Sequence, residues 1–179
     1  QSWESFVYHF TSRGSRYNKY SGGDVGKDSP EWQMTNQKNM RNFIRKWGTM
    51  VQHDEYMKPI VSPKYDIGFV VENCNTQMLR ELEPWCSDIY GDWIGHKGIG
   101  ANDYIKKEQP NTLIDLSKKI HSDHIEPKND IVVRFDTNKL NVNNFQIIVK
   151  LSDILKDSGE VGELELEIVD PPGDSDTEN

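Results

Sequence analysis

The residues best suited to chemistry stand near the start of the chain, where a histidine is followed by hydroxyl and guanidinium groups. The segment reads His9-Phe10-Thr11-Ser12-Arg13-Gly14-Ser15-Arg16. An imidazole can ligate a divalent cation, while hydroxyl and guanidinium groups can hold phosphate oxygens. The pattern therefore indicates a metal site at His9, with Ser12, Arg13 and Arg16 as phosphate ligands. A hydrogen-bonded structural histidine at the end of a strand is the simpler interpretation of His9 taken alone.

Two tryptophans form a second candidate site. Trp85 and Trp93 flank Cys86 and Asp88, and their rings could form a platform on which a sugar stacks. Burial of both rings against a sheet is the alternative. Cys74 and Cys86 are the two cysteines of the chain. They form no CxxC pair, so we interpret them as reduced thiols of a cytoplasmic protein.

The elements around the histidine are predicted from composition and periodicity. Residues 5–10 are rich in aromatic and β-branched side chains, which is typical of a short strand. A polar loop follows from Thr11 to Pro30. Residues 31–47 have a helical pattern, and Gly48 stands where a helix commonly ends. The apolar side of that helix would consist of Trp32, Met40, Phe43, Ile44 and Trp47.

The remainder of the chain alternates between strand and helix patterns. Strands are predicted over 66–71, 88–93, 131–135 and 163–168. Helices are predicted from Asn75 to Leu82, around an apolar face of Leu113, Leu116 and Ile120, and from Asn143 to Gly159. This order predicts an α/β (α+β) fold, with a small ferredoxin-like or open α/β sandwich over residues 64–169. Residues 51–63 are interpreted as a linker and residues 170–179 as a disordered acidic tail.

Charge is distributed unevenly between residues 1–50 and the rest of the chain. The 179 residues carry a net charge of −8, but residues 1–50 hold eight basic and four acidic groups. The remaining residues therefore contain 13 basic and 25 acidic groups. The basic segment favours an anionic ligand, whereas the acidic remainder argues against nucleic acid as a partner. No apolar run approaches the roughly 20 residues of a membrane-spanning helix.

The strand, loop and helix at the start resemble part of a known enzyme family. This part of the chain resembles the C-terminal end of the catalytic domain in family-two, GT-A-type nucleotide-sugar glycosyltransferases. The features that match are a strand that ends in His9, a Ser/Gly/basic loop, and a helix that contains Asn39, Phe43, Lys46, Trp47 and Gly48. The resemblance covers about residues 3–48. It implies that His9 helps to coordinate a Mn²⁺ or Mg²⁺ ion at the diphosphate of the sugar donor, with Arg13, Arg16 and Ser12 near the phosphates.

These observations lead to one expected function and one alternative. In the first, residues 1–50 end a glycosyltransferase domain that uses a nucleotide-sugar donor, and residues 64–169 bind the acceptor or a partner. The chain is then expected to be part of a longer protein, because the family's Asp-x-Asp motif and catalytic base would precede Gln1. In the alternative, the chain is a non-catalytic binding or assembly module, joined to a protein partner or a second copy through residues 64–169 and carrying a basic N-terminal docking arm.

Overall fold

The computed structural model describes residues 30–93, 100–159 and 161–165. The chain divides into two units, residues 1–41 and residues 42–179. Helix α1 runs from Pro30 to Trp47, which confirms the helix predicted over 31–47. Gly48 ends it with a φ of 74°, and its N–H donates to the Ile44 carbonyl at 2.6 Å. The predicted strand over 5–10 and the loop after it belong to the residues outside the described ranges.

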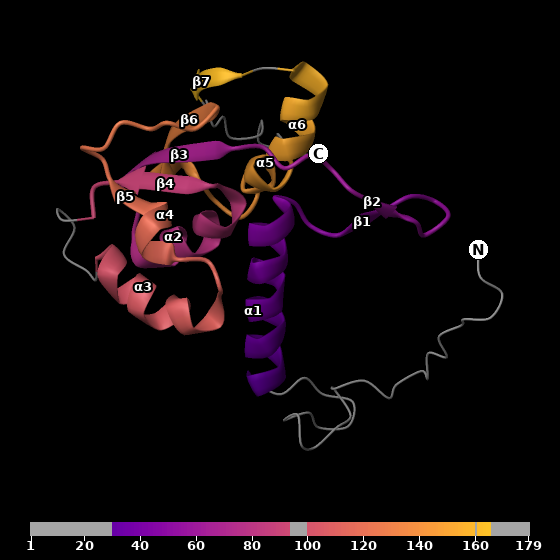
Figure 1. Cartoon of the computed structure of the whole chain (residues 1–179), viewed down its shortest axis with the longest axis horizontal. Helices are drawn as coiled ribbons and strands as arrows, with labels where there is room; N and C mark the ends of the chain where they lie inside the picture. Colours follow the sequence, from indigo (N-terminus) through magenta and orange to yellow (C-terminus); the bar gives the residue numbers. More distant parts are fainter. Residues whose placement is uncertain (1–29, 94–99, 160, 166–179) are drawn as a thin grey trace, which may run out of the picture. The chain divides into compact units, whose positions relative to one another are not determined.

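The centre of the second unit is a five-stranded sheet in which every neighbouring pair is parallel. Its spatial order is β5-β4-β3-β6-β7, and Figure 1 shows β3 between β4 and β6. The strands are β3 (Ile67–Glu72), β4 (Asp88–Gly91), β5 (Ile120–Ser122), β6 (Ile131–Asp136) and β7 (Gly162–Glu165). The predicted α/β class is confirmed. Of the two expected arrangements the open α/β sheet is observed, because a ferredoxin-like sheet would contain antiparallel pairs.

Short helices connect these strands. They are α2 (Thr76–Leu82), α3 (Ala101–Glu108), α4 (Leu116–Lys119), α5 (Gln146–Val149) and α6 (Leu151–Ser158). Tight 3-10 turns follow α2, α3 and β6, over Glu83–Trp85, Gln109–Asn111 and Thr137–Lys139. A small antiparallel hairpin of β1 (Gln52–His53) and β2 (Pro59–Ile60) lies within the residues interpreted as a linker.

The apolar core lies on one face of the sheet. Alternate strand residues such as Ile67, Phe69 and Val71 belong to a single buried cluster, as expected when successive side chains point to opposite faces. The same cluster contains the buried side chains of all five short helices, namely Leu79, Leu82, Tyr104, Leu116, Ile148, Leu151 and Leu155. Helices α2 to α6 therefore cover the same face of the sheet.

The opposite face is crossed by the connection between β5 and β6. Because β5 lies at the sheet edge and β6 beyond β3, residues 123–130 must pass over β4 and β3. Asn129 in this connection accepts from the Tyr90 hydroxyl at 3.1 Å and donates to Asp66 and Asp88 at 2.8 Å each. A Cβ on Gly68 would lie only 2.3 Å from Asn129 Oδ1, so the glycine makes room for the crossing.

Two predicted elements differ from the structure. The helix expected around Leu113, Leu116 and Ile120 is present only as the short helix α4, which buries Leu116. Leu113 is fully exposed outside any helix, and Ile120 begins strand β5. The helix expected from Asn143 begins at Gln146 and is interrupted at Lys150. Its predicted end is confirmed, because Gly159 closes α6 with a φ of 68°. In both cases a spacing compatible with a helix recurs by chance across a turn.

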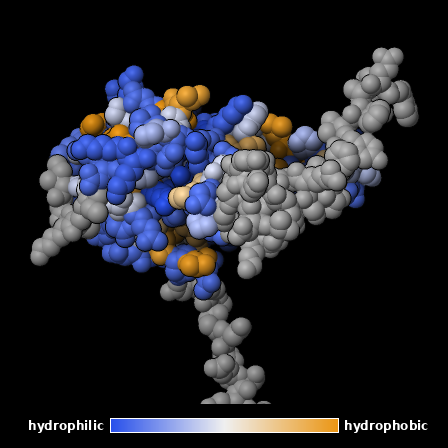
Figure 2. Space-filling model, turned by 90° about the horizontal axis from the view of Figure 1, so that it is seen from below, coloured by the Kyte–Doolittle hydropathy of each residue, from blue (hydrophilic) through white to orange (hydrophobic). Residues whose placement is uncertain are grey.

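One face of the molecule, drawn in Figure 2, is mainly hydrophilic. On the face shown in Figure 2, hydrophobic residues form small separate areas among hydrophilic ones, in agreement with the mean hydropathy of −0.77. Among the described residues, no helix combines the length and apolar character needed to cross a membrane.

Candidate functional site

The strand order reverses between two neighbouring strands, β3 and β6. The chain leaves β3 toward β4 and leaves β6 toward β7, in opposite directions along the sheet. In open α/β sheets, ligands bind outside the carboxyl ends of the strands at such a switch point. The loops after β3 and β6 are therefore the first place to look for a site.

Hydrogen bonds hold these two loops together. Asn73 donates from Nδ2 to Asp136 Oδ1 at 2.9 Å, and the Thr137 hydroxyl donates to the Glu72 carbonyl at 3.0 Å. Asn73 has a φ of 54°, a left-handed conformation that asparagine tolerates better than most residues. The hydrogen bonds from the Asn73 side chain and the Asn138 N–H hold the pKa of Asp136 below its ordinary value. The strand ends are thus a rigid base for whatever binds beside them.

A pocket of about 530 Å³ opens beside this base. Helix α2 contributes Met78 and Glu81 to its lining. The segment after β6 contributes Leu140, Asn141, Val142, Phe145 and Gln146. The volume falls within the roughly 300–1,000 Å³ typical of small-molecule sites. We name it the switch-point crevice.

Each wall of the switch-point crevice is held in place by asparagine side chains. Asn75 caps α2 by accepting from the Met78 N–H at 2.8 Å. On the other wall, Asn141 Oδ1 accepts from the N–H groups of Asn143 and Asn144 at 2.8 and 3.1 Å. The Asn144 Nδ2 group donates to the Lys139 carbonyl at 2.8 Å. Because short polar side chains fix the turns, the apolar lining is presented in a defined position.

The lining combines apolar side chains with amide and carboxylate groups. Met78, Leu140, Val142 and Phe145 provide apolar surface, while Asn141 and Gln146 can both donate and accept hydrogen bonds. Such a mixture suits an organic ligand with one apolar face and several polar groups. The crevice can therefore bind and orient a ligand of this kind.

The residues predicted from the sequence fall elsewhere. His9, Ser12, Arg13 and Arg16 lie outside the described residues, so their assignment stays a prediction. Trp85 and Trp93 are partly buried and pack against the core. The Trp93 indole N–H donates to the His121 carbonyl at 2.5 Å. Over the described ranges, no three His, Cys, Asp or Glu side chains come together as ligands for a cation, so no step through a metal is derived for this part of the chain.

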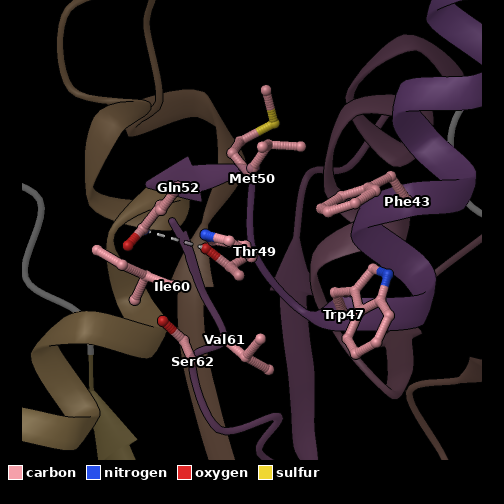
Figure 3. A pocket seen from close by; sticks show the side chains of 10 residues that line it. Phe43, Trp47, Thr49, Met50, Gln52, Ile60, Val61 and Ser62 are labelled. Carbon is pink, nitrogen blue, oxygen red and sulfur yellow. Dashed lines mark hydrogen bonds between the residues drawn. The ribbon is translucent and has the colours of Figure 1, made fainter. Parts of the chain in front are cut away.

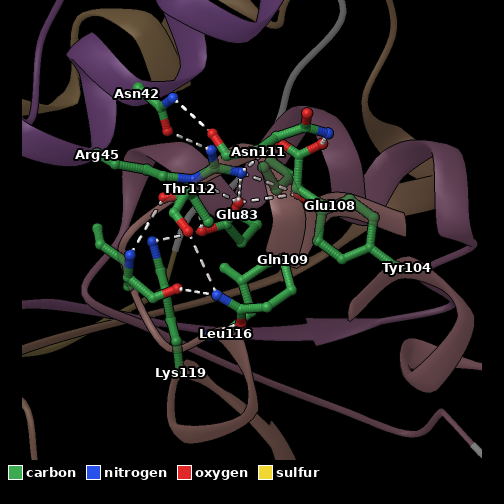
Figure 4. Close-up of polar contacts among 12 residues, drawn as sticks. Asn42, Arg45, Glu83, Tyr104, Glu108, Gln109, Asn111, Thr112, Leu116 and Lys119 are labelled. Atoms are coloured by element: carbon green, nitrogen blue, oxygen red, sulfur yellow. Dashed lines mark hydrogen bonds and ion pairs between the residues drawn. The ribbon is translucent and has the colours of Figure 1, made fainter. Parts of the chain in front are cut away.

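A second polar cluster is buried between α1 and the short helices (Figure 4). Arg45 donates from Nη2 to Glu83 at 2.7 Å and to Glu108 at 2.9 Å. Lys119 pairs with Glu83 at 2.8 Å, and the Tyr104 hydroxyl donates to the same carboxylate at 2.9 Å. We name this set the Arg45 cluster.

The Arg45 cluster is structural rather than catalytic. Its four charged side chains are at most 7% exposed and comprise two cations and two anions. Burial favours the neutral form of Glu83, but Lys119 and Arg45 outweigh it, so the pKa of Glu83 lies below its ordinary value. In the part of the chain that the structure describes, every buried side-chain N or O atom has a hydrogen-bond partner. A closed and satisfied network of this kind anchors the last turns of α1 to the sheet unit.

An apolar cavity of about 330 Å³ lies on the other side of the same helix end. Phe43 and Trp47 point from α1 toward residues of the hairpin segment, as Figure 3 shows. The two rings are 6.3 Å apart between centroids. The rest of the lining consists of Thr49, Met50, Val51, Gln52, Pro59, Ile60, Val61 and Ser62. Several neighbouring apolar side chains are open to solvent, including Val51 at 67% and Val61 at 71%.

Comparison with protein-family models, with curated proteins and with solved structures finds no match for this chain. The fold and the crevice therefore define it only as an open parallel α/β protein with a pocket between α2 and the segment that follows β6.

Sequence reasoning did not find the switch-point crevice. Asn73 and Asn75 after one buried strand and Asp136 after another were visible signals, because polar residues at strand ends often mark a site in parallel sheets. These polar residues indicate a shared site only if the two strands are known to be neighbours in the sheet. That adjacency depends on the crossing by residues 123–130, for which the sequence carries no periodic signal.

Proposed function

We propose that the chain is the C-terminal part of a metal-dependent glycosyltransferase, in which the sheet unit binds the acceptor in the switch-point crevice. In this proposal His9 helps to bind a Mn²⁺ or Mg²⁺ ion at the diphosphate of a nucleotide-sugar donor. Arg13, Arg16 and Ser12 lie near the phosphates. The two cysteines are free and buried, which supports placement in a reducing compartment such as the cytoplasm.

The observation that carries the acceptor role is the position of the crevice. A pocket of suitable volume lies between α2 and the segment that follows β6, and its lining includes the Phe145 ring and the amides of Asn141 and Gln146. A sugar has the same combination of an apolar ring face and hydroxyl groups. Aromatic side chains stack on the former, and amide groups hydrogen-bond with the latter.

Support for the transferase role comes from the resemblance over residues 3–48. Its described portion has the expected helix, with Phe43 and Trp47 on one side and Gly48 as the cap.

The acceptor role is tested by NMR titration of the full chain with neutral mono- and disaccharides. Amide shifts should be confined to the crevice, with Val142 and Phe145 among them. Val142→Asp should abolish them, because it places a charge on an apolar wall. Val161→Asp is the matched control, since Val161 is also exposed, at 75%, and does not line the crevice. Shifts elsewhere, or equal loss in both variants, would refute the acceptor site.

The transferase role is tested separately by calorimetry with UDP-glucose. Heat of binding should require Mn²⁺ and should be lost in His9→Ala. Binding that does not depend on the metal, or that survives in His9→Ala, would contradict the donor-site assignment without affecting the crevice.

The apolar cavity beside α1 favours an alternative function, a protein-binding or assembly module. Its open apolar rim, including Val51, Ile60 and Val61, is of the kind that interfaces cover. Sedimentation at increasing concentration tests self-association directly. A dimer that dissociates in Val61→Asp would support this alternative, and a monomer at high concentration would exclude assembly with a second copy.

A further inference from the structure

The switch-point crevice carries one charge in its lining. Glu81 on α2 is the charged residue among those that line it, and its side chain is exposed to solvent. Across the described ranges, the Glu81 side chain has neither a hydrogen bond nor an ion pair. Its carboxylate is therefore available to a ligand, whereas the carboxylates of Glu83 and Asp136 are engaged by neighbouring side chains.

Among the described residues, the crevice has no glycine-rich phosphate-binding turn of the kind found in folds of similar strand order. Dinucleotide-binding proteins place a glycine-rich turn between the first strand and its helix, and the helix N-terminus receives the pyrophosphate. Here that connection is Asn73-Cys74-Asn75. In the first turn of α2, the Met78 N–H donates to the Asn75 side chain at 2.8 Å, so it is not free to bind a phosphate oxygen. The helix that follows has only seven residues.

The remaining lining can contact a cationic group of a ligand as well as the ligand's apolar face. Phe145 is half-buried in the wall opposite α2. An aromatic ring attracts an ammonium group through its electron-rich face, and a carboxylate attracts the same group by charge.

We infer that the switch-point crevice selects an acceptor with a protonated amine, received by Glu81, and disfavours phosphorylated acceptors. This inference rests on the proposed acceptor role and names the charge class of the acceptor. An amino sugar is the simplest molecule that combines a sugar ring with such an amine.

Three sugars that differ mainly in charge provide the test. The full chain is titrated with glucosamine, glucose and glucose 6-phosphate at a pH where the amine is protonated, and the amide shifts of Val142 and Gln146 are followed. An exposed charge pair contributes about two- to five-fold in affinity. Glucosamine should therefore bind about that much more tightly than glucose, and glucose 6-phosphate should bind more weakly than glucose. The differences should shrink as salt is added.

The variant Glu81→Gln tests whether the Glu81 carboxylate causes the preference for glucosamine. It keeps the size of the side chain and removes its charge, so the ratio of the glucosamine affinity to the glucose affinity should fall to about one. Glu126→Gln is the matched control, since Glu126 is also exposed but lies on the connection that crosses the opposite face. A preference that persists in Glu81→Gln, or tighter binding of glucose 6-phosphate than of glucose, would overturn the inference alone. Failure of all three sugars to bind would refute the acceptor role, and the inference with it.

Discussion

Replacing Glu83 with glutamine should strongly destabilise the sheet unit. Glu83 is fully buried and pairs with two cations, Arg45 at 2.7 Å and Lys119 at 2.8 Å. Glutamine has nearly the same shape but no charge, so the cluster would keep two cations against the single anion Glu108. Breaking a buried ion pair in this way costs about 3–5 kcal/mol. That is a large part of the roughly 5–15 kcal/mol by which a domain is stable.

A double-mutant cycle separates charge imbalance from loss of packing. Lys119→Met removes the second cation while keeping the aliphatic stem. Alone it should also cost about 3–5 kcal/mol, because it leaves two buried anions against the single cation Arg45. In the double variant one cation and one anion remain, Arg45 and Glu108, which still bond at 2.9 Å. The double variant should therefore lose at least about 1 kcal/mol less than the sum of the single losses.

The assay is urea unfolding followed by tryptophan fluorescence. Glu81→Gln is the matched control: it lies two residues earlier in the chain and is exposed, so its effect should stay within about 0.5 kcal/mol. A loss below about 1 kcal/mol for Glu83→Gln, or strict additivity in the cycle, would refute the view that a balanced buried cluster anchors α1.

Three further predictions follow from the same contacts. Because Lys119 and Arg45 lower the pKa of Glu83 against the opposing effect of burial, its contribution should be complete above the ordinary value of 4.5. That contribution should be lost as the pH falls through the lower folded pKa, so urea midpoints measured between pH 6 and pH 3 should fall less steeply in Glu83→Gln. Burial raises the pKa of Cys74 and of Cys86 to about 12. Neither thiol should therefore react with a thiol reagent at pH 8 until the protein unfolds. Rapid labelling of the native protein would contradict their burial. Gly68→Ala should cost about 1–3 kcal/mol in urea unfolding, because the new Cβ would meet Asn129 Oδ1 at 2.3 Å; the penalty should shrink in an Asn129→Ala background, and an equal penalty there would place the strain elsewhere.

The sequence predicts those elements whose causes are local. Helix α1 follows from its apolar spacing and from Gly48, which takes up the left-handed conformation that ends it. Strand β3 follows from the apolar run Phe69-Val70-Val71, and β6 from Ile131-Val132-Val133, which Arg134 separates from Phe135. Asn75 was recognisable as a cap because its side chain bonds to the N–H three residues later.

Elements that depend on distant partners were missed. Strand β5 has three residues and exists because Ile120 pairs beside Ile89 of β4. The β1–β2 hairpin was missed for a different reason. Its turn bonds are local, since the Asp54 carboxylate accepts from the N–H groups of Tyr56 and Lys58, but each strand has only two residues and Pro59 begins the second. The crevice depends on strand order, and strand order is set by which faces are buried rather than by any local pattern.

The Arg45 cluster also has a consequence for how this sequence can diverge. Its charges come from positions 45, 83, 108 and 119, which lie on four separate segments and would look unrelated in an aligned set of sequences. Since removal of one charge leaves another buried without its partner, these positions can change only in compensating pairs. Chains descended from the same ancestor should therefore keep all four charges or replace a cation and an anion together. This joint inheritance would identify relatives whose overall identity is too low to reveal them.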